Sequence, residues 1–507
     1  MIGTAATSTH FTSLDLAVVA LYFVGTMVAG FAFSRRSRSV EGFTAAGRSL
    51  PGWLTGLSIL GTFISSITFL ALPAKAYASN WNAFVFSLSI PLATWIAVRW
   101  FLPFYRRGAH LSAYEHLEAR FGPWARVYAS LCYLLTQLAR MGTVMYLMAL
   151  PMSVLLGWDV RAIILLTGIS VTVYALVGGL VAVIYADAFQ TMVLVVGALV
   201  CAAVMVAGLP GGASGLFSVA AAHDKFSLGS FGPGLAQPTF WVVLLYGLVI
   251  NLQNFGIDQN YVQRYIASKS DREARKSVWL GGLAYVPLSA VFLFIGTALF
   301  AYYEARPDDL PLAYRGLEKA DSVFPWFIVS VLPPGVTGLL VAAIFAAAMS
   351  TVSTSLNSSA TIVLNDYYRR YVAPGTSEAR SLRLLRGTTI LWGLAGTGAA
   401  LAMTTVRSAL DAWWALAGIF GGGTIGLFLL GFVSRRADNR SALAGVGAGL
   451  ALIVWMTLSP RGSALPPAWR SPFHEFLIIV FGTAVVLAVG LALGRRRTAQ
   501  PPTELEP

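Results

Sequence analysis

The sequence predicts an all-α integral membrane protein with about thirteen transmembrane helices. Apolar residues make up 57% of the 507 residues and charged residues only 11%, and the mean hydropathy is +0.70; both values are typical of a membrane protein. Apolar runs of roughly twenty residues recur along the chain, which suits membrane-crossing helices and not the shorter strands of a β-barrel. A third observation, the placement of Lys and Arg, indicates how the helices are oriented.

Thirteen predicted spans account for the apolar runs. In chain order they are residues 12–34, 52–77, 80–104, 127–157, 160–178, 182–209, 239–264, 277–303, 324–366, 386–406, 409–433, 441–459 and 472–494. No basic stretch precedes the first span, so we expect a retained helix and not a cleaved signal peptide.

The basic residues favour an N-terminus outside and a C-terminus inside the cell. In that orientation the inside connections and the tail hold 25 of the 35 Lys and Arg, including five in Arg264–Lys276, and nine lie outside or near the outer ends. This bias is the positive-inside pattern. It explains the formal net charge of +13 without a nucleic-acid partner, and it predicts that the inside loops contact anionic membrane lipid.

The segment Leu340–Asp366 combines an apolar helix with an unusual density of hydroxyl groups. Its second half carries eight Ser and Thr within twelve residues, and Ser350, Ser353, Thr354 and Asn357 share one helical face. One or two hydroxyls would usually bond carbonyls of their own helix. So many neutral oxygens in lipid favour instead half of a site for a small, hard cation.

Two other spans are interrupted by polar residues near their centres. The interrupting residues are Gly61, Thr62, Ser65, Ser66 and Thr68 in span 52–77, and Asn251, Gln253, Asn254, Gly256, Asp258, Gln259 and Asn260 in span 239–264. Small polar residues can mark close helix packing. Two breaks five spans apart also fit inverted repeats of five helices, in which unwound carbonyls and helix ends bind ions and substrate.

Arg140 and Asp187 are charged residues within predicted spans. The Arg140 guanidinium stays charged and costs about 2.5–3.5 kcal/mol at this depth, so it needs either an acidic partner or the carboxylate of a substrate. Asp187 is a candidate cation ligand, proton relay or partner of Arg140. The five His are scattered at or outside span ends, so we do not expect an enzyme with a buried acid–base site.

Three motifs in order, GGLVAVIYADAFQ, DQNYVQRYIASKS and AAAMSTVSTSLNSSATIVLNDYY, together resemble the sodium:solute symporter family, which includes sodium/glucose, sodium/proline and sodium/sialic acid transporters. The resemblance covers essentially the whole chain and implies one transporter domain with a LeuT-type fold. Its parts would be an extra helix at 12–34, two inverted five-helix repeats at 52–209 and 239–433, two extra helices at 441–494 and a short cytoplasmic tail at 495–507.

The resemblance also implies sodium ligands. The site shared by the family would use carbonyls of Gly61, Ile64 and Ala347 and hydroxyls of Ser350 and Thr351. A second site, present in part of the family, would use Asp187, Ser350, Ser353 and Thr354. One sodium ion is therefore expected, and a second is compatible with the residues present.

The substrate-binding residues implied by the resemblance lie in the two interrupted spans and in span 127–157. They are Arg140, Ser65, Thr68, Phe63, Asn251, Asn254 and Gln259. SSITFLALPAKAY and Arg140 are most similar to the sialic acid branch, in which an arginine at this position holds the substrate carboxylate. Asn254 replaces the aromatic inner gate of the sugar transporters.

The function implied is sodium-coupled import of a small, anionic solute by alternating access, with sialic acid (N-acetylneuraminate) as the first choice. The chain would act as a monomer in the cell inner membrane. A sodium symporter for proline, another amino acid, a monocarboxylate or a sugar remains open. A channel and a transport-derived sensor are the alternatives from other classes.

Overall fold

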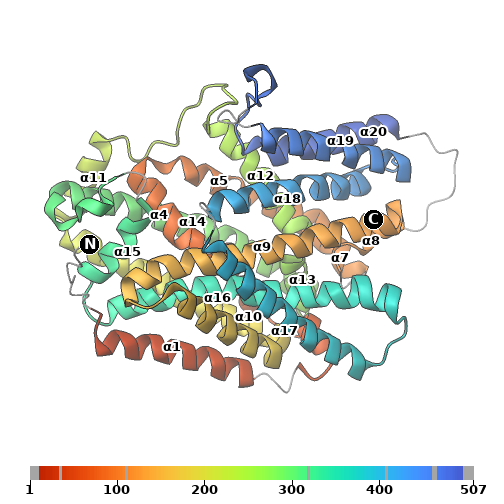
Figure 1. Cartoon of the computed structure of the whole chain (residues 1–507), viewed down its shortest axis with the longest axis horizontal. Coiled ribbons are helices and arrows are strands. Elements are labelled where there is room, and N and C mark those ends of the chain that lie inside the picture. The colour runs from red at the N-terminus through yellow and green to blue at the C-terminus, as the bar shows by residue number, and fades with distance from the viewer. Residues whose placement is uncertain are drawn as a thin grey trace.

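A computed structural model of the chain describes residues 11–32, 37–108, 112–316, 320–405, 409–459 and 465–494. Most of its helices run along the long axis of the molecule (Figure 1). Over the described residues the β-type pairing is limited to one parallel bridge between Leu50 and Ser268. The predicted all-α class is confirmed.

The α-helices differ widely in length, from single turns to a run that contains two predicted spans. They are α1 (Ser13–Ala32), α2 (Val40–Ala45), α3 (Gly52–Phe63), α4 (Ser66–Ala78), α5 (Phe84–Leu88), α6 (Ile90–Ile96), α7 (Leu102–Arg107), α8 (Glu115–Phe121), α9 (Pro123–Leu156), α10 (Val160–Gly208), α11 (Gly212–Ala222), α12 (Phe240–Ile257), α13 (Gln259–Ala267), α14 (Asp271–Ala305), α15 (Ala320–Ser330), α16 (Val336–Ile362), α17 (Glu378–Met403), α18 (Ala409–Val433), α19 (Asn439–Leu458) and α20 (Leu477–Leu493). Short 3-10 or π-helical turns adjoin them at η2 (Ala46–Arg48), η3 (Trp81–Ala83), η4 (Ala97–Phe101), η5 (Pro307–Asp309), η6 (Leu312–Tyr314), η8 (Val363–Val372) and η9 (Pro467–Trp469).

Several helices are long and apolar enough to cross a membrane. Among the described residues six helical runs meet this description, and the pair α3–α4, bent by 53°, makes a seventh if it counts as one span. The six are Trp81–Arg107, Val160–Gly208, Phe240–Ile257, Asp271–Ala305, Val336–Val372 and Asn439–Leu458. The chain is thus a multi-pass membrane protein, and the total of thirteen spans stays a prediction.

The predicted span 324–366 is wrong as a single helix, because the structure divides it into α15 and α16. Two consecutive prolines and Gly335, whose φ is 86°, stand between these helices, and neither residue type continues a helix easily. The Asp15 carboxylate of α1 then caps α16. Its Oδ1 accepts hydrogen bonds from the backbone N–H groups of Gly335 and Gly338, both at 2.7 Å.

A glycine marks the predicted tight connection between spans 160–178 and 182–209. Both spans lie in α10, and Gly179 interrupts the helical dihedrals with φ 55° and ψ −155°. A Cβ at Gly179 would approach the Phe43 ring to 2.9 Å. Both the left-handed φ and this close contact require glycine here.

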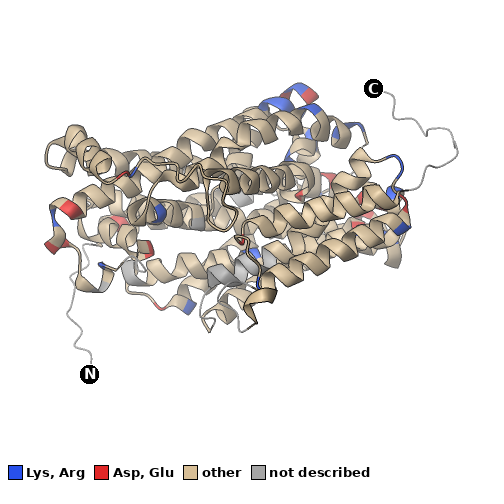
Figure 2. Cartoon of the chain, turned by 90° about the horizontal axis from the view of Figure 1, so that it is seen from above, with Lys and Arg blue, Asp and Glu red and all other residues tan. Residues whose placement is uncertain are grey.

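The basic connections gather at one end of the helix bundle, on the right in Figure 2. Contacts between them include an ion pair of Arg106 with Asp271, an ion pair of Arg370 with Glu118, and a hydrogen bond from Trp124 to Asn439. We call this region the basic end, defined by residues 37–50, 99–108, 112–126, 264–276, 369–386 and 434–440. Its shared location fits the charge bias in the sequence, and its assignment to the cytoplasm stays a prediction.

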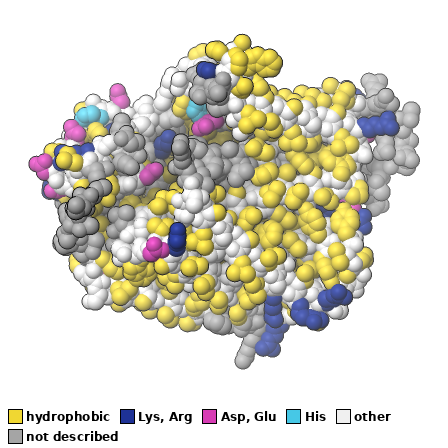
Figure 3. Space-filling model, in the orientation of Figure 1, with side chains coloured by type: hydrophobic (Ala, Val, Ile, Leu, Met, Phe, Trp, Pro, Cys, Tyr) yellow, Lys and Arg dark blue, Asp and Glu magenta, His cyan; other side chains and the backbone are white. Residues whose placement is uncertain are grey.

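Large apolar side chains cover much of the molecular surface, as the space-filling view shows (Figure 3). Leu21, Ile169 and Leu394 are 72%, 61% and 68% exposed. Such an extended apolar surface is costly in water and suits contact with lipid or another apolar partner. The exposed surface therefore agrees with the membrane class that the composition predicts.

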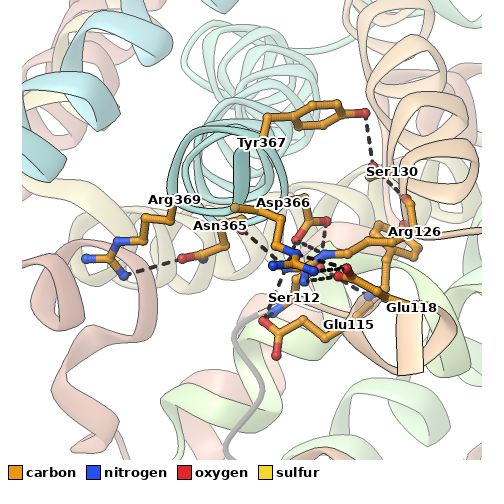
Figure 4. Close-up of polar contacts among 12 residues, drawn as sticks. Ser112, Glu115, Glu118, Arg126, Ser130, Asn365, Asp366, Tyr367 and Arg369 are labelled. Atoms are coloured by element: carbon orange, nitrogen blue, oxygen red, sulfur yellow. Dashed lines mark hydrogen bonds and ion pairs between the residues drawn. The ribbon is translucent and has the colours of Figure 1, made fainter. Parts of the chain in front are cut away.

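A buried ionic network joins α8, α9 and the continuation of α16 at the basic end of the molecule (Figure 4). Arg126 Nη2 lies 2.6 Å from Asp366 Oδ1 in η8, and Arg126 Nη1 lies 2.9 Å from Glu118 Oε2 in α8. Ser112 donates a hydrogen bond of 2.8 Å to the other Asp366 oxygen. Burial alone would raise the pKa of the Glu118 carboxyl, but its ion pairs with Arg370 and Arg126 lower it. The network anchors the far end of the hydroxyl-rich helix.

Candidate functional site

The first interrupted span breaks between α3 and α4. The helix ends at Phe63, and Ile64 and Ser65 are extended, with ψ of 107° and 171°. The last carbonyls of α3 therefore lack partners from the next helical turn. The Ser65 hydroxyl begins α4 as its N-cap by accepting a hydrogen bond of 3.4 Å from the Thr68 N–H.

The second interrupted span breaks at Asp258, between α12 and α13. Asp258 has φ −78° and ψ 118°, and its Oδ1 caps α13 through a hydrogen bond of 2.7 Å from the Asn260 N–H. The basic ends of the two broken spans are joined by backbone hydrogen bonds from Leu50 N to Ala267 O at 3.1 Å and from Lys269 N to Leu50 O at 2.9 Å. The two broken spans are thus tied to each other.

Helix α16 places the Ser350 hydroxyl against the end of α3. This hydroxyl lies 3.4 Å from the Gly61 carbonyl oxygen, whereas the Thr351 hydroxyl donates to the Ala347 carbonyl of its own helix at 3.2 Å. A Cβ on Gly61 would come within 2.5 Å of the Thr191 hydroxyl, so the close approach requires glycine. Of the five residues expected to hold the shared sodium ion, Gly61 and Ser350 meet between helices, Ala347 and Thr351 are joined within α16, and Ile64 lies in the extended segment after α3. Oxygen ligands of this kind suit a hard cation.

Asp187 of α10 lies beside the Ser350 and Thr354 hydroxyls of α16 and is fully buried. Its Oδ1 accepts a hydrogen bond of 2.8 Å from Ser350, and its Oδ2 lies 3.4 Å from the Thr354 hydroxyl. The Ser353 hydroxyl instead donates to the Ser350 carbonyl at 3.1 Å. The structure therefore brings Asp187, Ser350 and Thr354 together and turns Ser353 toward its own helix.

The partner of Asp187 is Arg264, not Arg140. The charge pattern predicts Arg264 to lie in an inside connection, but in the structure α13 continues to Ala267 and buries Arg264 completely. Arg264 Nη2 lies 2.6 Å from Asp187 Oδ2. A signal was present in the sequence. Asn260, Gln263 and Arg264 recur at helical spacing, as expected of a polar face packed against other polar groups.

That polar face of α13 packs against α9 and α16. The Tyr133 hydroxyl of α9 donates a hydrogen bond of 3.0 Å to Asn260 Oδ1. Gln263 Nε2 donates to the Thr361 hydroxyl at 2.7 Å and to Asn357 Oδ1 at 3.3 Å. The hydroxyl-rich half of α16 therefore serves two purposes, since part of it faces the candidate cation site and part of it holds α13.

Arg140 of α9 lies between the two breaks. Its Nη2 donates a hydrogen bond of 3.1 Å to the carbonyl of Thr62 in the last turn of α3. It also interacts electrostatically with Asp258 at the second break. Within the described residues no carboxylate forms a close ion pair with Arg140, whose guanidinium instead donates to the Thr62 carbonyl.

Phe63, Ser65 and Thr68 share the break beside which Arg140 lies. The Phe63 ring packs against Phe255 and Tyr261, with centroids 5.3 and 5.1 Å apart. This aromatic cluster joins the end of α3 to the second broken span. Aromatic and hydroxyl side chains next to one guanidinium form a mixed apolar and polar lining of the kind that small-molecule sites use.

The other three expected substrate residues lie elsewhere on the second broken span. Asn251 is fully buried and donates a hydrogen bond of 3.0 Å to Ser89, on the side of α12 that faces α5 and α6. Gln259 accepts a hydrogen bond of 2.8 Å from the Ala113 N–H near the basic end. Asn254 is half-buried on α12. A direct role of these three residues in substrate binding stays a prediction.

Comparisons with known proteins show the family of this chain. The model of the sodium:solute symporter family matches residues 43–449. The sodium/sialic acid symporter NanT of Aliivibrio fischeri is 34% identical over 95% of this chain and 92% of its own length. The sodium/sialic acid symporter SiaT of Proteus mirabilis is 32% identical over 93% of this chain and 94% of its own length.

A solved structure has the same fold. It is described as the substrate-bound, outward-open state of a Na⁺-coupled sialic acid symporter with a novel Na⁺ site. The two structures superpose with a TM-score of 0.88 at 30% sequence identity, over 96% of this chain and 98% of the other.

Proposed function

This chain belongs to the sodium:solute symporter family, and from that premise we propose that it imports N-acetylneuraminate (sialic acid) together with sodium ions by alternating access. The relatives named as sodium/sialic acid symporters match it over nearly their whole length. The single observation that carries the proposal is the position of Arg140 between two broken spans, one of which abuts the oxygen-rich face of α16.

Arg140 binds the substrate carboxylate in this proposal. Its hydrogen bond to the Thr62 carbonyl orients one edge of the guanidinium, and the remaining donors can form the two parallel hydrogen bonds that a carboxylate accepts. A substrate anion also offsets the cost of a permanent cation within the membrane. Ser65, Thr68 and Phe63 surround the bound solute, with Asn251, Asn254 and Gln259 as further candidates on the second broken span.

Sodium is the driving ion. One ion is held by the carbonyls of Gly61, Ile64 and Ala347 and the hydroxyls of Ser350 and Thr351, and it joins α16 to the break in α3. A second ion is held by Asp187, Ser350 and Thr354, with Ser353 rotating to complete the set. Sodium that binds the outward-facing form more tightly shifts the population toward that form and orders the substrate site.

Two sodium ions make a large difference to the work that the chain can do. For a tenfold sodium gradient and 100 mV, each ion supplies about 3.7 kcal/mol, and a monoanion costs about 2.3 kcal/mol to import. One ion then leaves about 1.4 kcal/mol, which is about tenfold accumulation. Two ions leave about 5.1 kcal/mol, or several thousandfold. Import of a dilute anion is therefore best served by both sites.

The membrane arrangement is part of the same proposal. We assign an inverted repeat of five plus five helices to residues 52–209 and 239–433, flanked by helices at 12–34 and 441–494, for thirteen spans. The N-terminus lies outside and the C-terminus lies inside the cell inner membrane, which places the basic end in the cytoplasm and next to anionic lipid. The chain works as a monomer in this proposal.

Uptake into proteoliposomes tests this proposal. Labelled N-acetylneuraminate should accumulate under an inward sodium gradient and should not accumulate when potassium replaces sodium. Arg140→Gln should abolish accumulation, and Arg140→Lys should retain only part of it because an ammonium lacks the planar fork. Uptake that is independent of sodium would contradict the proposal. Competition by unlabelled proline, monocarboxylates and sugars separates the alternative substrates, and non-saturable flux would indicate a channel.

A further inference from the structure

We infer that Arg264 is a tethered cation that competes with the second sodium ion for Asp187 and Thr354, and so sets the sodium affinity of that site. The inference deepens the proposed function and rests on its second sodium site. It assigns a role to Arg264, which is completely buried beside the expected sodium ligands.

The guanidinium of Arg264 already contacts the oxygens in question. Nη2 lies 2.6 Å from Asp187 Oδ2 and 2.7 Å from the Thr354 hydroxyl, so one nitrogen binds two of the expected ligands. Nε donates to the Ser58 hydroxyl at 2.7 Å, and Ser58 in turn donates to Asp187 Oδ2 at 2.6 Å. Arg264 Nη1 donates to the Asn260 carbonyl of its own helix.

The charges of these groups cannot all be satisfied at the same time. Asp187 is a single negative charge in a fully buried place, and a carboxylate there needs a cation nearby. Arg264 supplies one positive charge, and a sodium ion at the same carboxylate supplies a second. Two cations that share one carboxylate and one hydroxyl repel each other at short range in a medium of low polarity. Each cation therefore lowers the affinity of Asp187 for the other.

Competition of this kind suits a site that must empty in every transport cycle. A buried carboxylate without a counterion would hold sodium tightly and release it slowly. Arg264 replaces the ion when it leaves, so Asp187 never remains unpaired. Arginine stays charged at any physiological pH, so this replacement does not depend on a proton.

The competitor and the carboxylate belong to different helices. Arg264 lies on α13, the second half of a broken span, whereas Asp187 lies on α10 and Thr354 on α16. A small displacement of α13 relative to those helices changes the distance between Arg264 and Asp187. The sodium affinity of the second site is thereby linked to the position of α13.

Sodium titration of purified variants tests the inference. Thermal stability is measured against sodium concentration, with choline keeping the ionic strength constant, for wild type, Arg264→Gln, Arg264→Lys and the double variant Arg264→Gln with Asp187→Asn. We expect Arg264→Gln to lower the half-maximal sodium concentration at least tenfold. The double variant, which lacks both charges, should lose this high-affinity response. An unchanged or raised half-maximal concentration in folded Arg264→Gln would overturn the inference.

Arg264→Lys covers the case in which Arg264→Gln does not fold. A lysine ammonium keeps the charge but lacks the fork that joins Asp187 to Thr354 and Ser58, so we expect a half-maximal concentration several-fold below wild type. An unchanged or higher value for Arg264→Lys would refute competition. A wild-type protein whose stability does not respond to sodium would instead refute the proposed sodium coupling, so the two failures are distinct.

Discussion

Replacing Asp366 with Asn should destabilise the protein far more than replacing Arg370 with Gln, although both residues belong to the ionic network that Arg126 and Glu118 form. The Asp366 side chain is fully buried against Arg126, whose side chain is 9% exposed. The Arg370 side chain is 50% exposed where it pairs with Glu118. The two substitutions thus remove a buried and an exposed member of one network.

The expected magnitudes follow from burial. Removing one partner of a buried ion pair costs about 3–5 kcal/mol, because the other charge is left without compensation. Arg126 keeps its ion pair with Glu118 at 2.9 Å, so we expect about 3 kcal/mol for Asp366→Asn. An exposed pair contributes about 0–1 kcal/mol, so Arg370→Gln should cost no more than about 1 kcal/mol.

Unfolding of the purified protein by SDS in mixed micelles gives the apparent free energy of unfolding of each variant. The double variant Arg126→Met with Asp366→Leu is the control, since it removes both charges of the buried pair while Glu118 keeps its ion pair with Arg370, and it should cost less than Asp366→Asn alone. Equal losses for Asp366→Asn and Arg370→Gln would refute the assignment of the network's stability to its buried pair.

Two further predictions concern the sodium site and a loop lysine. Gly61→Ala should raise the sodium concentration for half-maximal uptake about tenfold. The reason is that a Cβ would meet the Thr191 hydroxyl at 2.5 Å, and overpacking costs about 1–3 kcal/mol. The double variant Gly61→Ala with Thr191→Ala should recover the wild-type value, and no recovery would exclude this clash as the cause. Burial lowers the pKa of Lys225 from 10.5 to about 8, although its Nζ donates to the Tyr77 carbonyl at 2.6 Å. As the pH rises, the folded protein then loses this proton before the unfolded chain does, so the free energy of unfolding should rise between about pH 8 and 10. Unfolding curves of Lys225→Met should lack this rise. The same pH dependence in wild type and Lys225→Met would contradict the lowered pKa of Lys225.

The sequence predicted the elements of the site better than their contacts. Hydropathy located long apolar helices such as α10 and α14, and the cluster of small polar residues located the break that the structure places at Ile64 and Ser65. The hydroxyl face of α16 was also evident from spacing alone. These features depend on local sequence, which is why a single sequence reveals them.

The partners of buried charges depend on the packing of distant helices and were harder to predict. An ion pair with Arg140 was one of three suggested roles for Asp187, but Arg264, 77 residues away, is its partner. Arg264 lies near the end of a span, where charged residues usually face water, so its sequence position gave a misleading signal. Asp366 likewise lies at a span end, yet it pairs with Arg126, 240 residues away. Neither pairing leaves a local pattern.

The sequence prediction missed the break that two consecutive prolines cause between α15 and α16. Residues 324–366 formed one apolar run, so hydropathy favoured a single span. The structure ends α15 before two prolines and begins α16 after Gly335, with the Asp15 carboxylate capping the new helix. The cap comes from a residue 320 positions away, and only the prolines could have indicated the boundary.

Simultaneous measurement of labelled sodium and labelled N-acetylneuraminate fluxes into the same proteoliposomes tests the central claim most directly. We predict that sialic acid enters only with sodium, at two sodium ions per solute, and that Asp187→Ala lowers this ratio to one. Equal sialic acid uptake under an inward sodium gradient and under an inward potassium gradient would contradict sodium-coupled symport by this chain.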